Sequence, residues 1–140
     1  MKYTKILFMA GAVTLIFIAL EASDTTVRDA QGRVVGTETQ MGGTTYYRDS
    51  QGRTQGSETT SGNVSYCRDA QGRMIGTKTV QGNQVVYRDA QGRLVKTETT
   101  NGNTTTIQDA QGRIIGTMTR DSSGTTTIRD AQGRVTGTKR

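Results

Sequence analysis

The residues best suited to bind a ligand are arginines that recur immediately before an aspartate. They stand at matching positions of a repeat: Arg28, Arg48, Arg68, Arg88 and Arg129. Tyr46 and Tyr66 lie two residues before two of them. Guanidinium groups pair with carboxylate, sulfate and phosphate groups. The row therefore predicts a site for an anionic polymer. The alternative is that these arginines only solvate an exposed face of a sheet.

Other residue types restrict the chemistry sharply. The chain has no His and one Cys, so most nucleophile–base pairs and transition-metal sites cannot be built. The aspartates of the repeat supply one carboxylate each, whereas Ca²⁺ needs several converging oxygen ligands. We therefore expect no enzyme activity, no metal and no cofactor. Cys67 is interpreted as a small hydrophobic residue, with an intermolecular disulfide as the alternative.

A 20-residue repeat positions all of these residues. The segment Arg28–Arg33 recurs four times at a spacing of 20 residues and once at 21. A fixed period of this length indicates a repeat architecture. The predicted structural residues are Asp29, Gly32, Arg33, Asp49, Gly52, Arg53, Asp69, Gly72, Arg73, Asp89, Gly92, Arg93, Asp109, Gly112, Arg113, Asp130, Gly133 and Arg134.

The segments between the glycines have the composition of β-strands. They are seven residues long, rich in Thr, Val, Ile and Tyr, and bounded by turn residues. Each turn reads x-x-Gly, which fits a three-residue hairpin loop closed by a left-handed Gly. This register pairs Asp29 with Arg33, Tyr46 with Gly56 and Tyr66 with Gly76. It also predicts one narrow apolar row on each face of the sheet. On the face of Asp29 and Arg33, this row is Val27, Val35, Tyr47, Gln55, Cys67, Ile75, Tyr87, Val95, Ile107, Ile115, Ile128 and Thr136.

The predicted fold is all-β, an antiparallel meander of about twelve strands built from tandem hairpins. A parallel β-solenoid with one coil per repeat is the alternative, but it would stack like charges directly over each other. A transmembrane barrel is rejected because strands of seven residues fall short of the roughly 9–11 that are needed. Leu, Ile, Val and Phe supply only 15 of the 118 residues after residue 22, which suits a sheet with a narrow apolar row.

The first 22 residues have the pattern of a secretory signal peptide. Two lysines precede fifteen uncharged residues, 6–20, and small residues follow. Cleavage is expected after Ala22, with Ala19 as the alternative site and an uncleaved anchor as a further alternative. The domains are then the signal peptide, 1–22, and the repeat domain, 23–140. We expect a secreted or cell-surface protein, with the periplasm as an alternative, that meets a membrane only through the uncleaved signal.

The unit Tyr-Arg-Asp-x-Gln-Gly-Arg at 47–53 and 87–93 resembles the YD repeats of Rhs-type and teneurin-type proteins. The resemblance covers residues 28–140 and implies a β-hairpin repeat. An Arg separates the Tyr from the Asp here, and Val27, Cys67, Ile107 and Ile128 replace the Tyr in other copies. A signal followed by five or six repeats is also similar in layout to curli-type amyloid subunits.

Three functions fit these patterns. The first is a secreted, non-enzymatic bacterial surface protein with a structural or adhesive role, which associates with itself through open strand edges and forms fibres. The second is a binding module for an anionic surface polysaccharide, which a secreted chain meets more readily than nucleic acid. The third, a periplasmic effector or immunity factor, rests only on the YD resemblance.

Overall fold

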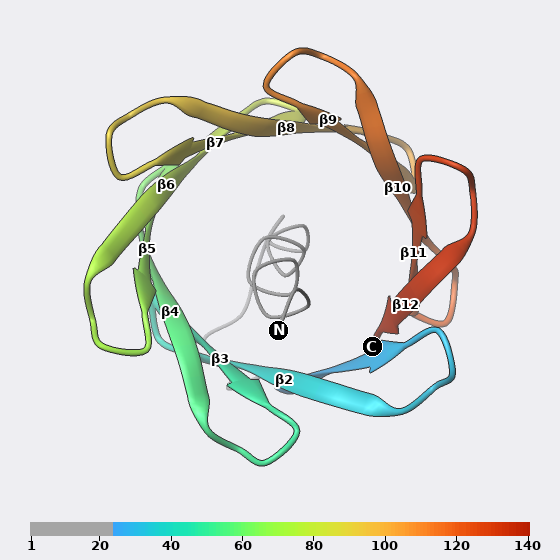
Figure 1. The fold of residues 1–140 in the computed structure, drawn as a ribbon, viewed down its shortest axis with the longest axis horizontal. Helices are drawn as coiled ribbons and strands as arrows, with labels where there is room; N and C mark the ends of the chain where they lie inside the picture. Colours follow the sequence, from blue (N-terminus) through green and yellow to red (C-terminus); the bar gives the residue numbers. More distant parts are fainter. Residues whose placement is uncertain (1–23) are drawn as a thin grey trace.

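The computed structural model describes residues 24–140 as a ring of antiparallel strands (Figure 1). The predicted signal peptide and its cleavage site lie outside the described residues. The twelve strands are β1 (Asp24–Asp29), β2 (Val34–Met41), β3 (Thr44–Asp49), β4 (Thr54–Ser61), β5 (Val64–Asp69), β6 (Met74–Gln81), β7 (Gln84–Asp89), β8 (Leu94–Asn101), β9 (Thr104–Asp109), β10 (Ile114–Arg120), β11 (Thr126–Asp130) and β12 (Val135–Lys139).

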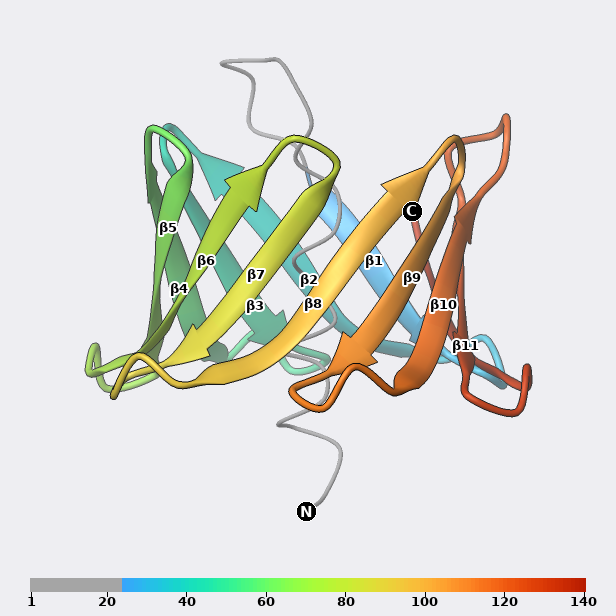
Figure 2. The same ribbon diagram turned by 90° about the horizontal axis from the view of Figure 1, so that it is seen from above.

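The prediction of an all-β chain of antiparallel hairpins is confirmed, but the open meander is wrong. Each strand pairs with its neighbours in sequence, and β12 pairs with β1 to close a barrel. The parallel solenoid is also wrong, because every strand pair is antiparallel. Figure 2 shows the strands inclined to the barrel axis, as closure requires. The described strands therefore have no open edge.

Six turns of one kind lie at the same end of the barrel, where they splay outward from the wall (Figures 1 and 2). In the first of them, the Asp29 N–H donates to the Arg33 carbonyl at 2.9 Å, and Gly32 adopts φ 78°. The predicted three-residue loop with a left-handed Gly is confirmed here. We call this end the aspartate-turn rim; its turns are 29–33, 49–53, 69–73, 89–93, 109–113 and 130–134.

The turns at the opposite end, which we call the glycine-turn rim, differ from the prediction. Met41 pairs with Thr44, so only Gly42 and Gly43 form the loop. A Gly with φ 59° at the first loop position is typical of a type II′ turn. The single extra residue of the last repeat changes one of these turns into a copy of the aspartate turn at 121–125, where Gly124 has φ 86°.

A β-bulge after each aspartate turn changes which side chains face inward. Arg28 pairs with Val34, but Val27 pairs with Gly36, so Val35 is an extra residue. The second strand of each hairpin therefore presents the face opposite to the predicted one. The predicted apolar row is correct for its first-strand members, Val27 among them, and wrong for the bulged residues: Val35, Gln55, Ile75, Val95, Ile115 and Thr136.

The bulge also corrects the predicted tyrosine pairs. Tyr46 pairs with Ser57 instead of Gly56, and Tyr66 pairs with Thr77 instead of Gly76. A Cβ added to Gly76 would lie 2.2 Å from the Arg88 carbonyl oxygen of the next hairpin. The glycine is therefore required by close approach of two strands, and no tyrosine ring covers it.

The inner wall that results is only partly apolar. Its buried apolar side chains are Val27, Tyr47, Tyr87, Ile107 and Met118. Buried charged side chains alternate with them around the ring: Glu38, Glu58, Lys78, Lys96, Glu98 and Lys139. The outer wall carries threonines along its middle, such as Thr37 and Thr39 of β2, because the bulge places them on the face opposite to Val27.

Candidate functional site

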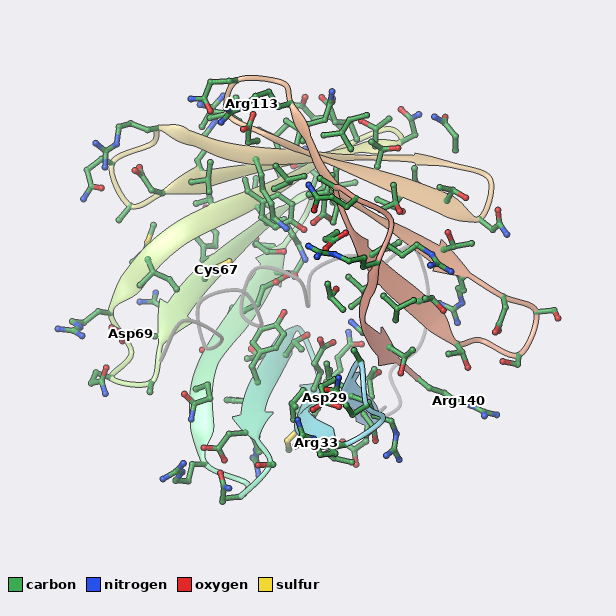
Figure 3. All side chains as sticks on the ribbon, turned by 45° about the vertical axis from the view of Figure 1, so that its right-hand side comes forward. Asp29, Arg33, Cys67, Asp69, Arg113 and Arg140 are labelled. Carbon is green, nitrogen blue, oxygen red and sulfur yellow. The ribbon has the colours of Figure 1, made fainter. Side chains whose placement is uncertain are left out.

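Each aspartate turn is held by its own carboxylate. Oδ1 of Asp29 accepts the backbone N–H groups of Gln31 and Arg33 at 2.9 Å each, and Oδ2 accepts Arg33 Nε at 2.7 Å. Desolvation of the carboxyl group would raise its pKa, but these bonds outweigh it and hold the pKa of Asp29 below 3.8. The other five turns repeat the arrangement. The predicted structural residues of the repeat thus do lie together in the turns (Figure 3).

The arginine that follows each loop is neutralised but still exposed. The Arg33 side chain is 76% exposed while its Nε contacts Asp29. A guanidinium group has five N–H donors, so one bond to the aspartate leaves further donors facing solvent. Figure 3 labels Arg33, Asp69 and Arg113 at three turns on different sides of the ring.

The arginine that precedes each aspartate has no carboxylate partner in its turn. Arg28 Nη1 instead donates to the Gly32 carbonyl at 2.9 Å, and Arg88 makes the same bond to Gly92 at 3.0 Å. Gln108 stands in this position in the fifth hairpin and donates to Gly112 at 2.9 Å. This bond closes the turn but does not neutralise the positive charge of the arginine. The hairpin with Gln108 has no charge at this position.

Arg48 departs from this pattern. Its Nε is buried without a hydrogen-bond partner, although the side chain belongs to the same row. Tyr46 lies two residues before it on the same outer face of β3, and Tyr66 and Arg68 repeat the pair on β5. Two strand spacings separate the pairs, roughly 10 Å. The structure thus brings together four of the residues that the sequence had predicted as a binding row.

The net charge of the described residues is concentrated at the aspartate-turn rim. Residues 24–140 contain sixteen basic and eleven acidic side chains, a net charge of +5. The aspartate-turn rim holds eleven arginines and six aspartates, which accounts for the whole +5. The inner wall holds three lysines and three glutamates. The four remaining charged residues, at the other end, also cancel: Asp24, Arg120, Asp121 and Arg140.

The inner wall contains a second cluster of ionisable groups that sequence reasoning missed. Glu58 receives a hydrogen bond from the Tyr47 hydroxyl at 3.0 Å and forms an ion pair with Lys78. Two repeats later, the Tyr87 hydroxyl donates to Glu98 at 2.9 Å. Burial raises the pKa of both tyrosines, and the carboxylates beside them raise it further.

Lys96 completes the second half of this cluster. It forms an ion pair with Glu98 and lies 4.1 Å from the centre of the Tyr87 ring. Burial lowers the pKa of Lys96, while Glu98 opposes that shift. Each charge of the inner wall thus has an opposite charge beside it. The bulge after each aspartate turn points Glu58 and Glu98 inward, and no residue pattern in the sequence marked that bulge.

Cys67 is half-buried and unpaired in the inner wall, on β5. Burial raises the pKa of its thiol to about 11, so it is a poor nucleophile at neutral pH. Its position fits the interpretation as a small hydrophobic residue. Among residues 24–140, no group of three or more His, Cys, Asp or Glu side chains is arranged to hold a metal ion.

Comparison with models of known families finds no match, and neither does comparison with curated proteins. No helix in the described part of the chain is long and apolar enough to cross a membrane. The resemblances to YD repeats and to curli subunits therefore stay predictions.

Proposed function

We propose that this chain is a secreted, non-enzymatic surface protein that binds an anionic polysaccharide through its aspartate-turn rim. The observation that carries the proposal is the location of charge. The six arginines that follow the loops are paired with aspartates, so the net +5 corresponds to five arginines without such partners: Arg28, Arg48, Arg68, Arg88 and Arg129. A ring of fixed charge of this kind attracts a polyanion.

The contact is centred on the outer wall of β3 and β5. Tyr46 and Tyr66 offer ring faces, and Arg48 and Arg68 offer guanidinium groups two residues further along the same strands. A sugar ring stacks on an aromatic face, and a carboxylate or sulfate pairs with guanidinium.

The test is retention of the mature protein on heparin-agarose. The first variant, Arg68→Gln/Arg88→Gln, lowers the charge by two and imitates Gln108, which keeps the bond to the loop glycine. The control, Arg120→Gln/Arg140→Gln, lowers the charge equally at the glycine-turn rim. We expect the first variant to elute at distinctly lower salt than the control, because only it removes charges that contact the polymer.

Two results contradict the proposal. Equal elution of the two variants would mean that retention reflects net charge alone. Elution of the first variant at the wild-type salt concentration would mean that the aspartate-turn rim does not contact the polymer. Circular dichroism of both variants serves as the control for retention of the fold.

A further inference from the structure

The junction between β1 and β12, which we call the seam, is the shortest strand pairing in the barrel. Its register contains three residue pairs: Val27–Lys139, Arg28–Thr138 and Asp29–Gly137. The other neighbouring strands share four to six pairs. Two backbone hydrogen bonds between Thr26 and Arg140 extend the seam. No loop joins the two strands, so the seam is held by non-covalent contacts alone.

The seam repeats the chemistry of an ordinary junction between hairpins. At the junction of β2 and β3, Gly36 pairs with Asp49 and Thr37 pairs with Arg48. At the seam, a Gly again pairs with an Asp and a Thr with an Arg. The edge of β12 that pairs with β1 is therefore complementary to the β1 edge of any copy of the chain, with the register already set.

A buried ion pair reinforces the same contact. Lys139 of β12 reaches across β1 to Glu38 of β2, with Nζ 2.5 Å from Oε2. Both side chains are buried. A copy of the chain that supplied β1 and β2 would present its own Glu38 to Lys139 in the same geometry. The ion pair can therefore form within one chain when the barrel closes, and between two chains when they assemble.

We propose that the seam is a docking site for a second copy of this chain. When the seam opens, β12 of one molecule pairs with β1 of the next, and the hairpin repeat continues from chain to chain. Both states make the same contacts, so concentration decides between them. Closure competes with pairing to a second chain. Because β1 and β12 belong to one chain, each meets the other at an effective concentration on the order of millimolar. Head-to-tail pairing of this kind gives larger rings when it closes and filaments when it does not.

The test uses a disulfide placed across the seam. Thr26→Cys/Arg140→Cys, in a chain that also carries Cys67→Ser, joins two residues that exchange both backbone hydrogen bonds. The reduced protein is refolded at about micromolar and about millimolar concentration, sized by chromatography with light scattering, and then oxidised. We expect monomers with an intramolecular disulfide from dilute solution. From concentrated solution we expect oligomers whose disulfides join different chains.

Two controls isolate the seam. Monomers oxidised in dilute solution should stay monomeric after unfolding and concentrated refolding, and reduction should restore assembly. Thr106→Cys/Thr117→Cys places a disulfide between two paired residues inside the hairpin of β9 and β10, and this oxidised variant should still assemble.

The proposal is overturned if the Cys67→Ser chain stays monomeric at every concentration. It is equally overturned if the oligomers contain only intramolecular seam disulfides, because the chains would then associate through another surface. A seam disulfide that leaves assembly unaffected leads to the same conclusion. These measurements do not involve a polysaccharide, and the variants leave the arginines of the aspartate-turn rim unchanged. The test of the seam can therefore fail or succeed independently of the proposed polysaccharide binding.

Discussion

At the scale of single residues, a buried hydrogen bond to a charged group contributes more to the free energy of unfolding than an exposed one does. The Tyr87 hydroxyl donates to Glu98 inside the wall, and both side chains are buried. Tyr66, on the outer face, is 40% exposed. Removing a donor from a buried carboxylate leaves an acceptor unsatisfied, whereas a surface hydroxyl exchanges its partner for water.

Tyr87→Phe is therefore expected to lower the free energy of unfolding by about 1–3 kcal/mol, because Glu98 loses the hydroxyl. The matched control, Tyr66→Phe, is expected to change it by less than about 0.5 kcal/mol. Chemical denaturation monitored by circular dichroism measures both. Equal effects of the two substitutions would show that the buried Tyr–Glu bond does not stabilise the wall.

At the scale of the hairpin, the aspartate turn is the repeated unit of stability. Its carboxylate has a pKa below 3.8 in all six copies, because backbone and Arg bonds to it outweigh desolvation. A folded pKa below the unfolded one contributes stability that is complete above pH 3.8. That stability is lost as the pH falls through the folded pKa.

Asp89→Asn removes the charge at every pH and leaves a side chain of similar size. The variant should be less stable than wild type at neutral pH, and the difference should shrink below pH 3.8 as the wild-type carboxylate is protonated. Thermal unfolding at a series of pH values measures this. A difference that stayed constant down to the most acidic pH would contradict the assignment of the charged carboxylate as the stabilising group.

The ion pair that crosses the seam allows a prediction at the same scale. Lys139→Gln leaves Glu38 without its ammonium partner and should cost about 3 kcal/mol, as for other buried pairs that lose one member. Glu38→Gln/Lys139→Gln should recover much of that loss, and a double-mutant cycle measures the coupling. Additive effects of the two single substitutions would mean that the pair does not fasten the seam.

The hairpins and the aspartate turns could be predicted from the sequence because their signals are local. Asp29, Gly32 and Arg33 specify a turn that needs no distant partner. The bulge could not be predicted, because Val35 is as suitable for a paired position as for an extra one, and its place depends on the neighbouring strand. The corresponding extra residue of the next hairpin, Gln55, points Glu58 inward and pairs Tyr46 with Ser57. The sequence around Gly42 likewise fits both the predicted three-residue loop and the observed two-residue loop.

At the scale of the whole molecule, closure is a cumulative property. Each bulge adds a small bend and twist, and only the sum over six hairpins brings β12 to β1. The same closure gathers the six aspartate turns into one rim and so concentrates the net charge there. It also removes the open edges from which self-association had been predicted. In this account, assembly starts from the seam.

Closure of the barrel can be measured by hydrogen exchange of two backbone amides at the seam. The Thr26 N–H donates to the Arg140 carbonyl at 2.6 Å, and the Arg140 N–H donates to the Thr26 carbonyl at 3.0 Å. In a monomer, both bonds can form only if the barrel is closed. In dilute solution, we predict that these amides exchange roughly two orders of magnitude or more below the intrinsic rate, though faster than amides in the middle of the wall. Exchange of both amides at the intrinsic rate, with β6 and β7 protected, would show that the sheet is open and that the barrel does not close.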